Sequence, residues 1–414
     1  MIRLRTIAAG LIGLGLTGLG WPPAAMAQES REIGPESSLC LEMNAVPPGG
    51  ELVLRPGEYA GPCAIRSGGE PGSPIVIRAK DPLQRPRIVY AGNTSNVIDV
   101  RADHVTIQGL ALGPTQRDVD GIRIYGRAGI TVEDCEFSGL GGIAVVANHR
   151  SSQGMTVRRN VIRGSEATAM YFGCHDGVSC VATGLTIEGN YIHTVRAPDP
   201  EIGYGIQIKL NSGGVVRDNT IIDTKGPGIM VYGTMDITRA SLIEGNVVMG
   251  SLRSSGIVAG GGPAVIRNNV SIGNAIAGVG VEDYGRRGML RGVMVVHNTL
   301  YRNEQRAVAL FRNGYIDVSI INNALHGRPG PLLPEPQPGL RMAGNIDCRA
   351  QACFVDPENS DFSPVPGGLL IGTGTVRIEP WVPGQDYFGA PRPVPPTPGA
   401  VEPPGGLIRL APRP

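Results

Sequence analysis

Between residues 131 and 325 the hydrophobic and polar positions repeat in one short phrase, which centres on an asparagine flanked by apolar residues. The phrase recurs, with small variations, as TVRRNVI, TIEGNYI, VVRDNTI, LIEGNVV, VIRNNVS, VVHNTL and IINNAL. Its asparagines are Asn160, Asn190, Asn219, Asn246, Asn269, Asn298 and Asn323, and successive ones are separated by 30, 29, 27, 23, 29 and 25 residues. A repeat of roughly 20 to 50 residues is typical of a solenoid.

A second phrase precedes each asparagine, in which a small residue is followed by alternating apolar residues. Its copies are GIRIY, GIAVV, AMYF, GIQIK, GIMVY, GIVAG, GVGVE and AVALF. Alternation with a period of two predicts half-buried strands, and no window has the spacing of an amphipathic helix. Each repeat therefore holds at least two short strands separated by turns.

One strand pair per repeat cannot bury its own apolar face, so the repeats must stack. Stacking places equivalent residues above one another at roughly 4.8 Å. The asparagines then form a column in which each side chain bonds a backbone group or the amide of the next coil. We predict an all-β fold, a single-stranded parallel β-helix of roughly ten coils with an N-terminal cap and a proline-rich C-terminal extension.

The two phrases also resemble the repeats of right-handed parallel β-helix proteins of the pectate-lyase-like superfamily. The stretches PGGELVLRPGEYAGP and PIVIRAKDP near the start, and CFVDPENSDFSPVPGG and DYFGAPRP near the end, are similar to that group as well. The resemblance covers roughly residues 46–402. It implies the right-handed fold and leaves the activity open, since the superfamily contains lyases, epimerases, hydrolases and non-catalytic surface proteins.

The chain divides into four parts. Residues 1–27 begin with two arginines and an apolar stretch and end in an A-x-A site, which predicts a secretory signal peptide. A membrane anchor is the alternative, although the apolar run is short and glycine-rich. Residues 28–330 are expected to form the capped β-helix, 331–385 a terminal capping coil, and 386–414 an extended, partly disordered proline-rich tail. The mature protein is then periplasmic or secreted from a bacterium.

The seven cysteines agree with an oxidising compartment. They fall into the local pairs Cys40 with Cys63, Cys174 with Cys180, and Cys348 with Cys353, and leave Cys135 as a small core residue. The 37 basic and 36 acidic residues nearly balance and form no basic run. We therefore expect no nucleic-acid partner and, after signal cleavage, no stable membrane insertion. A monomer is expected.

In the second phrase the isoleucines face inward and the alternate residues outward. The first outward column is predicted to be Asp99, Arg123, Ala144, Tyr171, Gln207, Met230, Val258, Gly280 and Ala309. The second is Arg101, Tyr125, Val146, Gly173, Lys209, Tyr232, Gly260, Glu282 and Phe311. Large polar and aromatic residues gather in the middle coils between small ones, which is the pattern of a groove with functional side chains on its floor.

Lys209 is the only lysine in these two columns. The predicted catalytic residues are Lys209, Tyr232, Tyr171 and His175, and the predicted substrate-binding residues are Arg123, Tyr125, Gln207, Asp176, Glu282 and Tyr284. Proton abstraction beside a sugar carboxylate needs a base, a group that neutralises the carboxylate, and an acid for the leaving oxygen. Lys209 or His175 suits the base, Arg123 or Gln207 the neutraliser, and Tyr171 or Tyr232 the acid.

The phrase GIQIKLNSGGVVRDNTI resembles the lysine-bearing coil of alginate- and chondroitin-type lyases, which implies that Lys209 is the base. The arginine that those lyases carry one coil further on is replaced here by Tyr232, with Arg239 beyond it. The DPHD motif of mannuronan epimerases is absent, and the columns lack the aspartates of pectinase-type hydrolases.

The leading hypothesis is a polysaccharide-active enzyme that performs β-elimination or C5-epimerisation on an acidic, uronate-containing polysaccharide. The competing hypothesis is a non-catalytic carbohydrate-binding or envelope-structural protein, and a glycoside hydrolase is the third. Asp118 and Asp120, with Glu282 and Asp283, are candidate oxygen ligands for calcium, but their spacing is not that of an organised site. No residue is assigned to a metal site.

Overall fold

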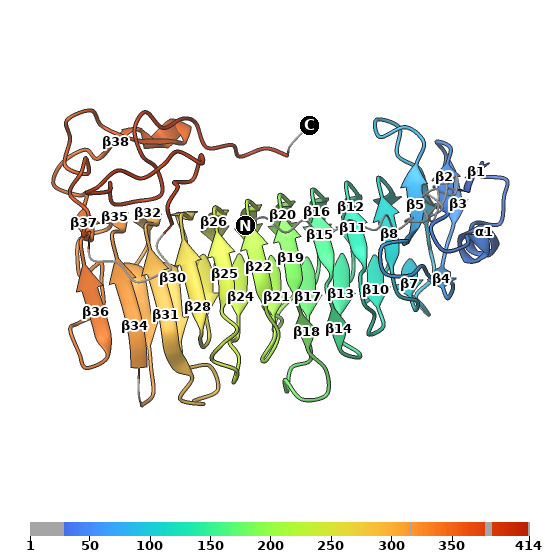
Figure 1. Cartoon of the computed structure of the whole chain (residues 1–414), viewed down its shortest axis with the longest axis horizontal. Helices are drawn as coiled ribbons and strands as arrows, with labels where there is room; N and C mark the ends of the chain where they lie inside the picture. The colour runs from blue at the N-terminus through green and yellow to red at the C-terminus, as the bar shows by residue number, and fades with distance from the viewer. Residues whose placement is uncertain (1–28, 315, 377–382, 413–414) are drawn as a thin grey trace, which may run out of the picture.

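The computed structural model describes residues 29–314, 316–376 and 383–412, so the predicted signal peptide, 1–27, lies outside the described residues. Three long parallel sheets run side by side along the molecule and have thirteen, twelve and ten strands (Figure 1). We call them sheets A, B and C. From β4 to β35 the chain visits sheets C, A and B in turn, which confirms the parallel β-helix. The thirteen strands of sheet A correct the expected number of coils, roughly ten.

The strands of each sheet have the following bounds. Sheet A contains β1 (Ser30–Ile33), β2 (Glu51–Leu54), β5 (Ile75–Ala79), β8 (Val105–Gln108), β11 (Thr131–Glu133), β15 (Thr156–Arg158), β19 (Leu185–Glu188), β22 (Gly214–Arg217), β25 (Ser241–Glu244), β28 (Ala264–Arg267), β31 (Leu290–Val296), β34 (Ile316–Ile321) and β36 (Leu340–Ala343). Sheet B contains β3 (Glu58–Ala60), β6 (Arg87–Val89), β9 (Ala111–Leu112), β12 (Glu136–Leu140), β16 (Val161–Ser165), β20 (Tyr191–Val195), β23 (Thr220–Thr224), β26 (Val247–Ser251), β29 (Val270–Ile272), β32 (Thr299–Asn303), β35 (Ala324–Gly327) and β37 (Ile346–Asp347). Sheet C contains β4 (Cys63–Ile65), β7 (Ile98–Val100), β10 (Ile122–Ile124), β13 (Val145–Ala147), β17 (Met170–Phe172), β21 (Ile206–Ile208), β24 (Ile229–Val231), β27 (Ile257–Ala259), β30 (Ala277–Glu282) and β33 (Arg306–Phe311).

The remaining elements lie at the ends of the stack or in excursions from it. They are α1 (Leu39–Ala45), β14 (Ser152–Gln153), β18 (Ala182–Thr183), β38 (Phe354–Asp356), the 3-10 helix η1 (Pro357–Asn359) and β39 (Asp361–Pro364). Helix α1 is joined to β4 by the disulfide Cys40–Cys63. None of the described helices is both long and apolar enough to cross a membrane.

The interior of the coils is filled by the alternating apolar residues that the sequence pattern marks. Ile206 and Ile208 of β21 are fully buried, as are Val216 of β22 and Ile221 of β23. The coils between β4 and β35 thus contribute inward side chains from all three sheets to one continuous core. This burial is the main favourable contribution to stacking, because one coil alone leaves the same surface in water.

A column of buried asparagines lies at the turn between sheets A and B. Each side chain donates from Nδ2 to the Oδ1 atom of the next asparagine, and that same Oδ1 accepts the backbone N–H of the asparagine before it. Asn345 extends the predicted column by one coil. At the other end the free thiol residue Cys135 takes the position, and its backbone N–H donates to Asn160 Oδ1 at 3.0 Å.

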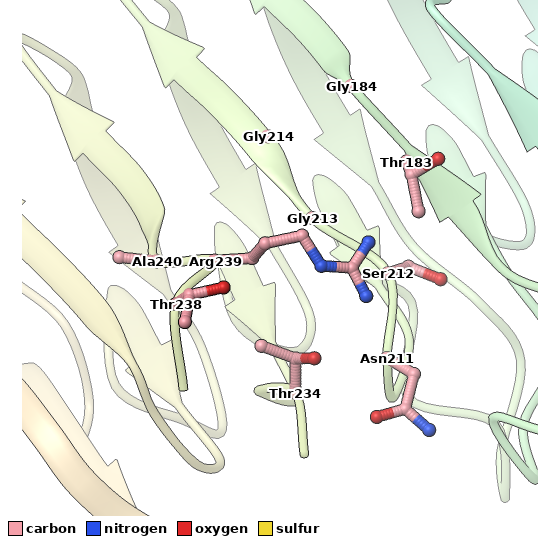
Figure 2. A pocket seen from close by; sticks show the side chains of 10 residues that line it. All are labelled: Thr183, Gly184, Asn211, Ser212, Gly213, Gly214, Thr234, Thr238, Arg239 and Ala240. Carbon is pink, nitrogen blue, oxygen red and sulfur yellow. The ribbon is translucent and has the colours of Figure 1, made fainter. Parts of the chain in front are cut away.

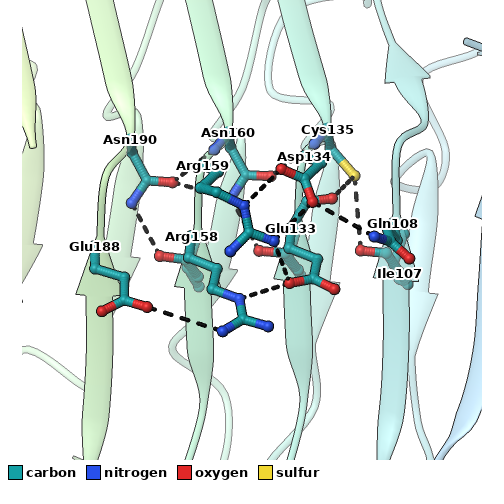
Figure 3. Close-up of polar contacts among 12 residues, drawn as sticks. Ile107, Gln108, Glu133, Asp134, Cys135, Arg158, Arg159, Asn160, Glu188 and Asn190 are labelled. Carbon is teal, nitrogen blue, oxygen red and sulfur yellow. Dashed lines mark hydrogen bonds and ion pairs between the residues drawn. The ribbon is translucent and has the colours of Figure 1, made fainter. Parts of the chain in front are cut away.

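Charges alternate along the neighbouring column of sheet A (Figure 3). In register order its members are Glu133, Arg158, Glu188, Arg217, Glu244 and Arg267. Arg158 Nε lies 2.6 Å from Glu133 Oε2, and Arg217 Nη2 lies 2.6 Å from Glu188 Oε2. A slip by one coil would place like charges opposite each other, so this ladder supports the same register as the asparagines.

The three predicted disulfides are confirmed, and Cys135 is buried and free. The expected extended tail is wrong for the described residues 386–412, which fold back over sheet B beside β32, β35 and β37 (Figure 1). Ala400 and Val401 are buried there. Arg392 Nη1 and Glu402 Oε1 form an ion pair at 2.7 Å with almost no exposure. The high proline content of this segment suggested an extended tail. A few apolar residues are nevertheless enough to anchor the segment to the coils.

Replacing Asn246 by alanine should destabilise the fold by about 2–4 kcal/mol, because it leaves several buried groups without partners. Asn246 Oδ1 accepts from both the backbone N–H and the side chain of Asn219, and Asn246 Nδ2 donates to Val216 O at 2.9 Å. Thermal unfolding of Asn246→Ala measures the loss. Exposed Asn313 provides the control, since Asn313→Ala should change the midpoint little. Equal midpoints for the two variants would show that the column adds nothing to stability.

Candidate functional site

The outward positions of sheet C follow the predicted columns with one correction. Tyr171 pairs with Gln207, Gln207 with Met230, and Met230 with Val258. The member contributed by β13 is Val146 and not Ala144, because Arg123 pairs with Val146. The phrase GIAVV is therefore shifted by two residues relative to its neighbours, a slip that keeps the alternation and so leaves no trace in the hydrophobic pattern.

Three excursions from the coils cover these positions. The first precedes β21 and carries Tyr204, the second is the loop closed by Cys174–Cys180, and the third follows β30 and carries Tyr284. Gln207, Lys209 and Tyr232 point away from the coil interior, yet they are only 3, 4 and 2% exposed. They point outward as predicted, but they do not face solvent, because the excursions pack over sheet C.

Lys209 is the centre of the cluster that these excursions enclose. Its ammonium nitrogen lies 3.3 Å from His175 Nδ1 and 3.4 Å from the Tyr232 hydroxyl. It also lies 5.0 Å from the ring centre of Tyr171 and 4.4 Å from that of Tyr232, which are cation–π distances. The four predicted catalytic residues are thus in mutual contact through one nitrogen atom.

Gln207 and two further tyrosines complete the cluster. The Tyr232 hydroxyl accepts a hydrogen bond from Gln207 Nε2 at 3.0 Å and is hydrogen-bonded to the Tyr204 hydroxyl. The ring of Tyr284 packs edge-on against Tyr232 with a centroid separation of 4.5 Å. Tyr232 therefore connects Lys209 on one side with Tyr204 and Tyr284 on the other.

Burial sets the protonation behaviour of the cluster. Burial, together with a smaller effect of the nearby positive charge of Arg287, lowers the pKa of Lys209 to about 8. Burial raises the pKa of Tyr171 to about 12 and raises that of Tyr232 well above its ordinary value. A substantial fraction of the lysine is therefore neutral near physiological pH, while both tyrosines keep their protons.

A cavity of about 250 Å³ lies on the far side of the tyrosines. Tyr204, Tyr284 and Glu282 line it together with Met230 and Val258 from the floor of sheet C. Burial raises the pKa of Glu282, and within the described residues its carboxylate has neither an ion pair nor a hydrogen bond. Glu282 and Tyr284, both predicted to bind substrate, thus share one cavity, which is next to the Lys209 cluster.

Arg123 and Tyr125 lie apart from this centre. Strand β10 is three strands from β21 in sheet C, a separation of roughly 14 Å at the usual strand spacing. Arg123 Nε donates to Asp120 Oδ2 at 2.8 Å, and the guanidinium of Arg101 lies 4.0 Å from the ring centre of Tyr125. Neither residue reaches Lys209, so Arg123 cannot neutralise the carboxylate of a sugar bound there.

Asp176 has a local role in the Cys174–Cys180 loop. Its carboxylate accepts from the backbone N–H groups of Val178 and Ser179 and from the Ser179 hydroxyl, and these bonds lower its pKa to about 2. It therefore fixes the turn that presents His175 to Lys209.

Sequence reasoning missed Tyr204 and Arg287. Both residues belong to excursions that are longer than a coil turn requires. The extra length of these excursions was the one sequence feature that could have pointed to them. Their placement beside Tyr232 and Tyr284 depends on loop packing that no periodicity encodes.

The described residues contain no group of three or more histidine, cysteine, aspartate or glutamate side chains suited to a metal ion. Two of the candidate calcium ligands are engaged elsewhere. Asp120 pairs with Arg123, and Asp283 accepts the backbone N–H groups of Gly288 and Met289. Calcium binding stays an untested prediction.

Residues 120–325 match the family described as "Right handed beta helix region". Solved structures with this fold include an alginate lyase of the PL6 family, AlyGC, in a mutant form, with a TM-score of 0.51 and 13% identity over 86% of this chain and 60% of that one. Pectate lyase Pel9A has a TM-score of 0.48 and 15% identity over 91% of this chain and 97% of that one. The PL6-family lyase of Pseudopedobacter saltans has a TM-score of 0.48 and 13% identity over 87% and 98%.

The chain spans about 60% of the length of the alginate lyase that it matches. No curated protein sequence matches significantly. At these sequence identities the structural likeness establishes only the fold. The activity has to be argued from the residues of the site. Together with the family match over residues 120–325, the three stacked parallel sheets identify this chain as a right-handed parallel β-helix protein.

Proposed function

We propose that this chain is a periplasmic or secreted bacterial enzyme that acts on an acidic polysaccharide by β-elimination or C5-epimerisation of a uronate. The observation that carries the proposal is the Lys209 amine, whose pKa of about 8 is combined with contacts to His175 and Tyr232. An amine with this pKa is a competent general base near neutral pH. The three disulfides support the assignment to an oxidising compartment.

In the proposed reaction the neutral Lys209 amine takes the proton from C5 of the uronate. The electron pair left on C5 forms a C4–C5 double bond as the C4–oxygen bond breaks. Tyr171, half-buried at the edge of the cluster, gives its proton to the leaving glycosidic oxygen. If the C4–oxygen bond stays intact and a proton returns to the opposite face of C5, the same site performs epimerisation.

The sugar carboxylate must be neutralised for its neighbouring proton to become acidic. Arg287 suits this role better than Arg123, since its charge already acts on Lys209 and its guanidinium is exposed. The nitrogen Arg287 Nη1 donates to Tyr284 O at 3.1 Å, which holds the residue beside the cluster.

Substrate would reach Lys209 from the side of the Cys174–Cys180 loop. His175 is exposed and covers the ammonium, so a sugar must displace its ring to meet the amine. The disulfide limits how far the loop can move, and we assign His175 the role of positioning the amine or relaying its proton.

Burial of Lys209 also supports the second candidate, a non-catalytic carbohydrate-binding or envelope-structural protein. In that case the ammonium would be a packing element that the tyrosine rings stabilise. Such a protein would bind glycans and leave them unchanged. A glycoside hydrolase would instead release reducing ends without new unsaturation.

Replacing Lys209 by methionine should lower kcat by roughly 10²–10⁴-fold on a uronate polymer, because the general base is lost. Absorbance of unsaturated products measures elimination, and exchange of the C5 proton with solvent deuterium measures epimerisation. Lys80 offers a control, since it is exposed and paired with Glu32, and Lys80→Met should keep wild-type turnover. Full activity of Lys209→Met would refute its role as base, and unchanged glycans with the wild-type protein would favour the binding protein.

The rate should rise with pH and level off above about 8, because the base acts only when it has lost its proton. The Arg287→Gln variant removes a positive charge that lowers the pKa of Lys209, so the rising limb of its profile should move to higher pH. Exposed Arg286 is the matched control, and Arg286→Gln should leave the limb in place. A rate that falls between pH 6 and 8 would contradict a lysine base.

A further inference from the structure

A second cavity, of about 310 Å³, lies on the turns that lead from sheet C to sheet A (Figure 2). Turns of three successive coils contribute to it, namely the end of β18, the turn after β21 and the turn after β24. Its polar side chains are Thr183, Asn211, Ser212, Thr234, Thr238 and Arg239. It is separate from the cavity beside Tyr204 and shares no lining residue with it.

The wall of this cavity is held in place before any ligand arrives. Asn211 Nδ2 donates to Gly177 O, and Asn211 Oδ1 accepts the backbone N–H of Met235, both at 2.9 Å. Buried Ser212 accepts from the backbone N–H of Ala182 at 2.9 Å. These bonds join three excursions into one rigid wall, so little ordering is needed on binding.

Arg239 supplies the positive charge. Its Nε atom donates to Asp236 Oδ2 at 2.7 Å, which orients the guanidinium. Figure 2 shows the group extended across the opening toward Ser212. For Nη1 and Nη2 no bond is found within the described part of the chain, and the side chain is 54% exposed. Two free N–H-bearing nitrogens in one plane match the two oxygens of a carboxylate.

A smaller cavity of about 90 Å³ continues the path along the helix axis. It shares the turn at Thr234 with the first cavity and adds Arg287 and Arg291. Strand β31, which begins just before Arg291, is two strands from β25 in sheet A. The basic groups are therefore repeated along the axis at roughly 10 Å, which suits a chain with regularly spaced anionic groups.

We propose that the Arg239 cavity binds one carboxylate-bearing sugar of an acidic polysaccharide, whose next residues follow the turns toward Arg287 and Arg291. The cavity takes the carboxylate on Arg239, and the threonine and serine hydroxyls face the sugar hydroxyls. The inference rests on the proposed function for its substrate class, and it places the polymer on the turns beside sheet C as well as at Lys209.

The test measures binding of galacturonate, mannuronate and guluronate oligosaccharides to the full-length protein by calorimetry, without reference to turnover. Arg239→Gln should weaken binding of the preferred oligomer by about tenfold or more, since a charge-assisted bond is lost. The matched control is Arg196→Gln, because Arg196 is 55% exposed and also paired with an aspartate, Asp223, but lies directly after β20 of sheet B. The control should bind as the wild-type protein does.

Two further measurements keep the outcome interpretable. The methyl ester of the preferred oligomer, which lacks the charge, should bind wild-type protein and Arg239→Gln equally weakly. Ala240→Met, which fills the cavity and keeps the arginine, should also weaken binding. Both variants should unfold at the wild-type temperature.

Three results would overturn the proposal: equal binding by Arg239→Gln and Arg196→Gln, equal affinity for the acid and its ester, or no binding of any uronate oligomer. Failure of the proposed chemistry gives a different result. In that case Lys209→Met would convert substrate at the wild-type rate, or the wild-type protein would convert no substrate. In both cases oligosaccharide binding would still depend on Arg239.

Discussion

The hydrogen-bonded column of buried asparagines is the constraint on which the rest of the molecule depends. An amide at the turn between sheets A and B can satisfy its donors and acceptor only if the next coil presents its own asparagine at the same height. A displaced coil would leave several polar groups buried without partners, each at a cost of about 1–3 kcal/mol. The column therefore converts a general tendency to stack apolar coils into a single register, and the alternating charges of sheet A favour the same one.

That register places the functional side chains. Lys209, Gln207 and Tyr232 come from adjacent coils, and they meet because β21 and β24 pair without a bulge. The rigid scaffold leaves the excursions free to vary, since a turn can lengthen without disturbing the strands on either side. The excursions then supply what the coils lack: Tyr204 and Tyr284 enclose the cluster, and the disulfide-closed loop brings His175 onto the ammonium.

The scaffold could be predicted from the sequence and the surroundings of the site could not. The spacing of Asn160 through Asn323 and the alternation in phrases such as GIQIK are local signals, so they predict coils, inward isoleucines and the contact between Lys209 and Tyr232. The shift at Ala144 escaped detection because a two-residue slip preserves the alternation. The burial of Lys209, the roles of Tyr204 and Arg287, and the packing of residues 386–412 depend on contacts between segments far apart in the chain, for which no repeat provides a template.

The burial of Lys209 has two opposite consequences for chemistry, and they follow from one cause. Removing the amine from water lowers its pKa to about 8 and so makes it a usable base, but the same enclosure keeps a polymer away from it. A site with a suitable base that no substrate can reach would be inactive. His175, which contacts the ammonium of Lys209, is exposed and is therefore the weak point of the enclosure. A polymer held by arginines on the neighbouring turns would lie next to that weak point, so binding energy gained outside the cluster could offset displacement of the histidine. In the proposed function, glycan binding and access to the base would thereby be coupled through the same excursions.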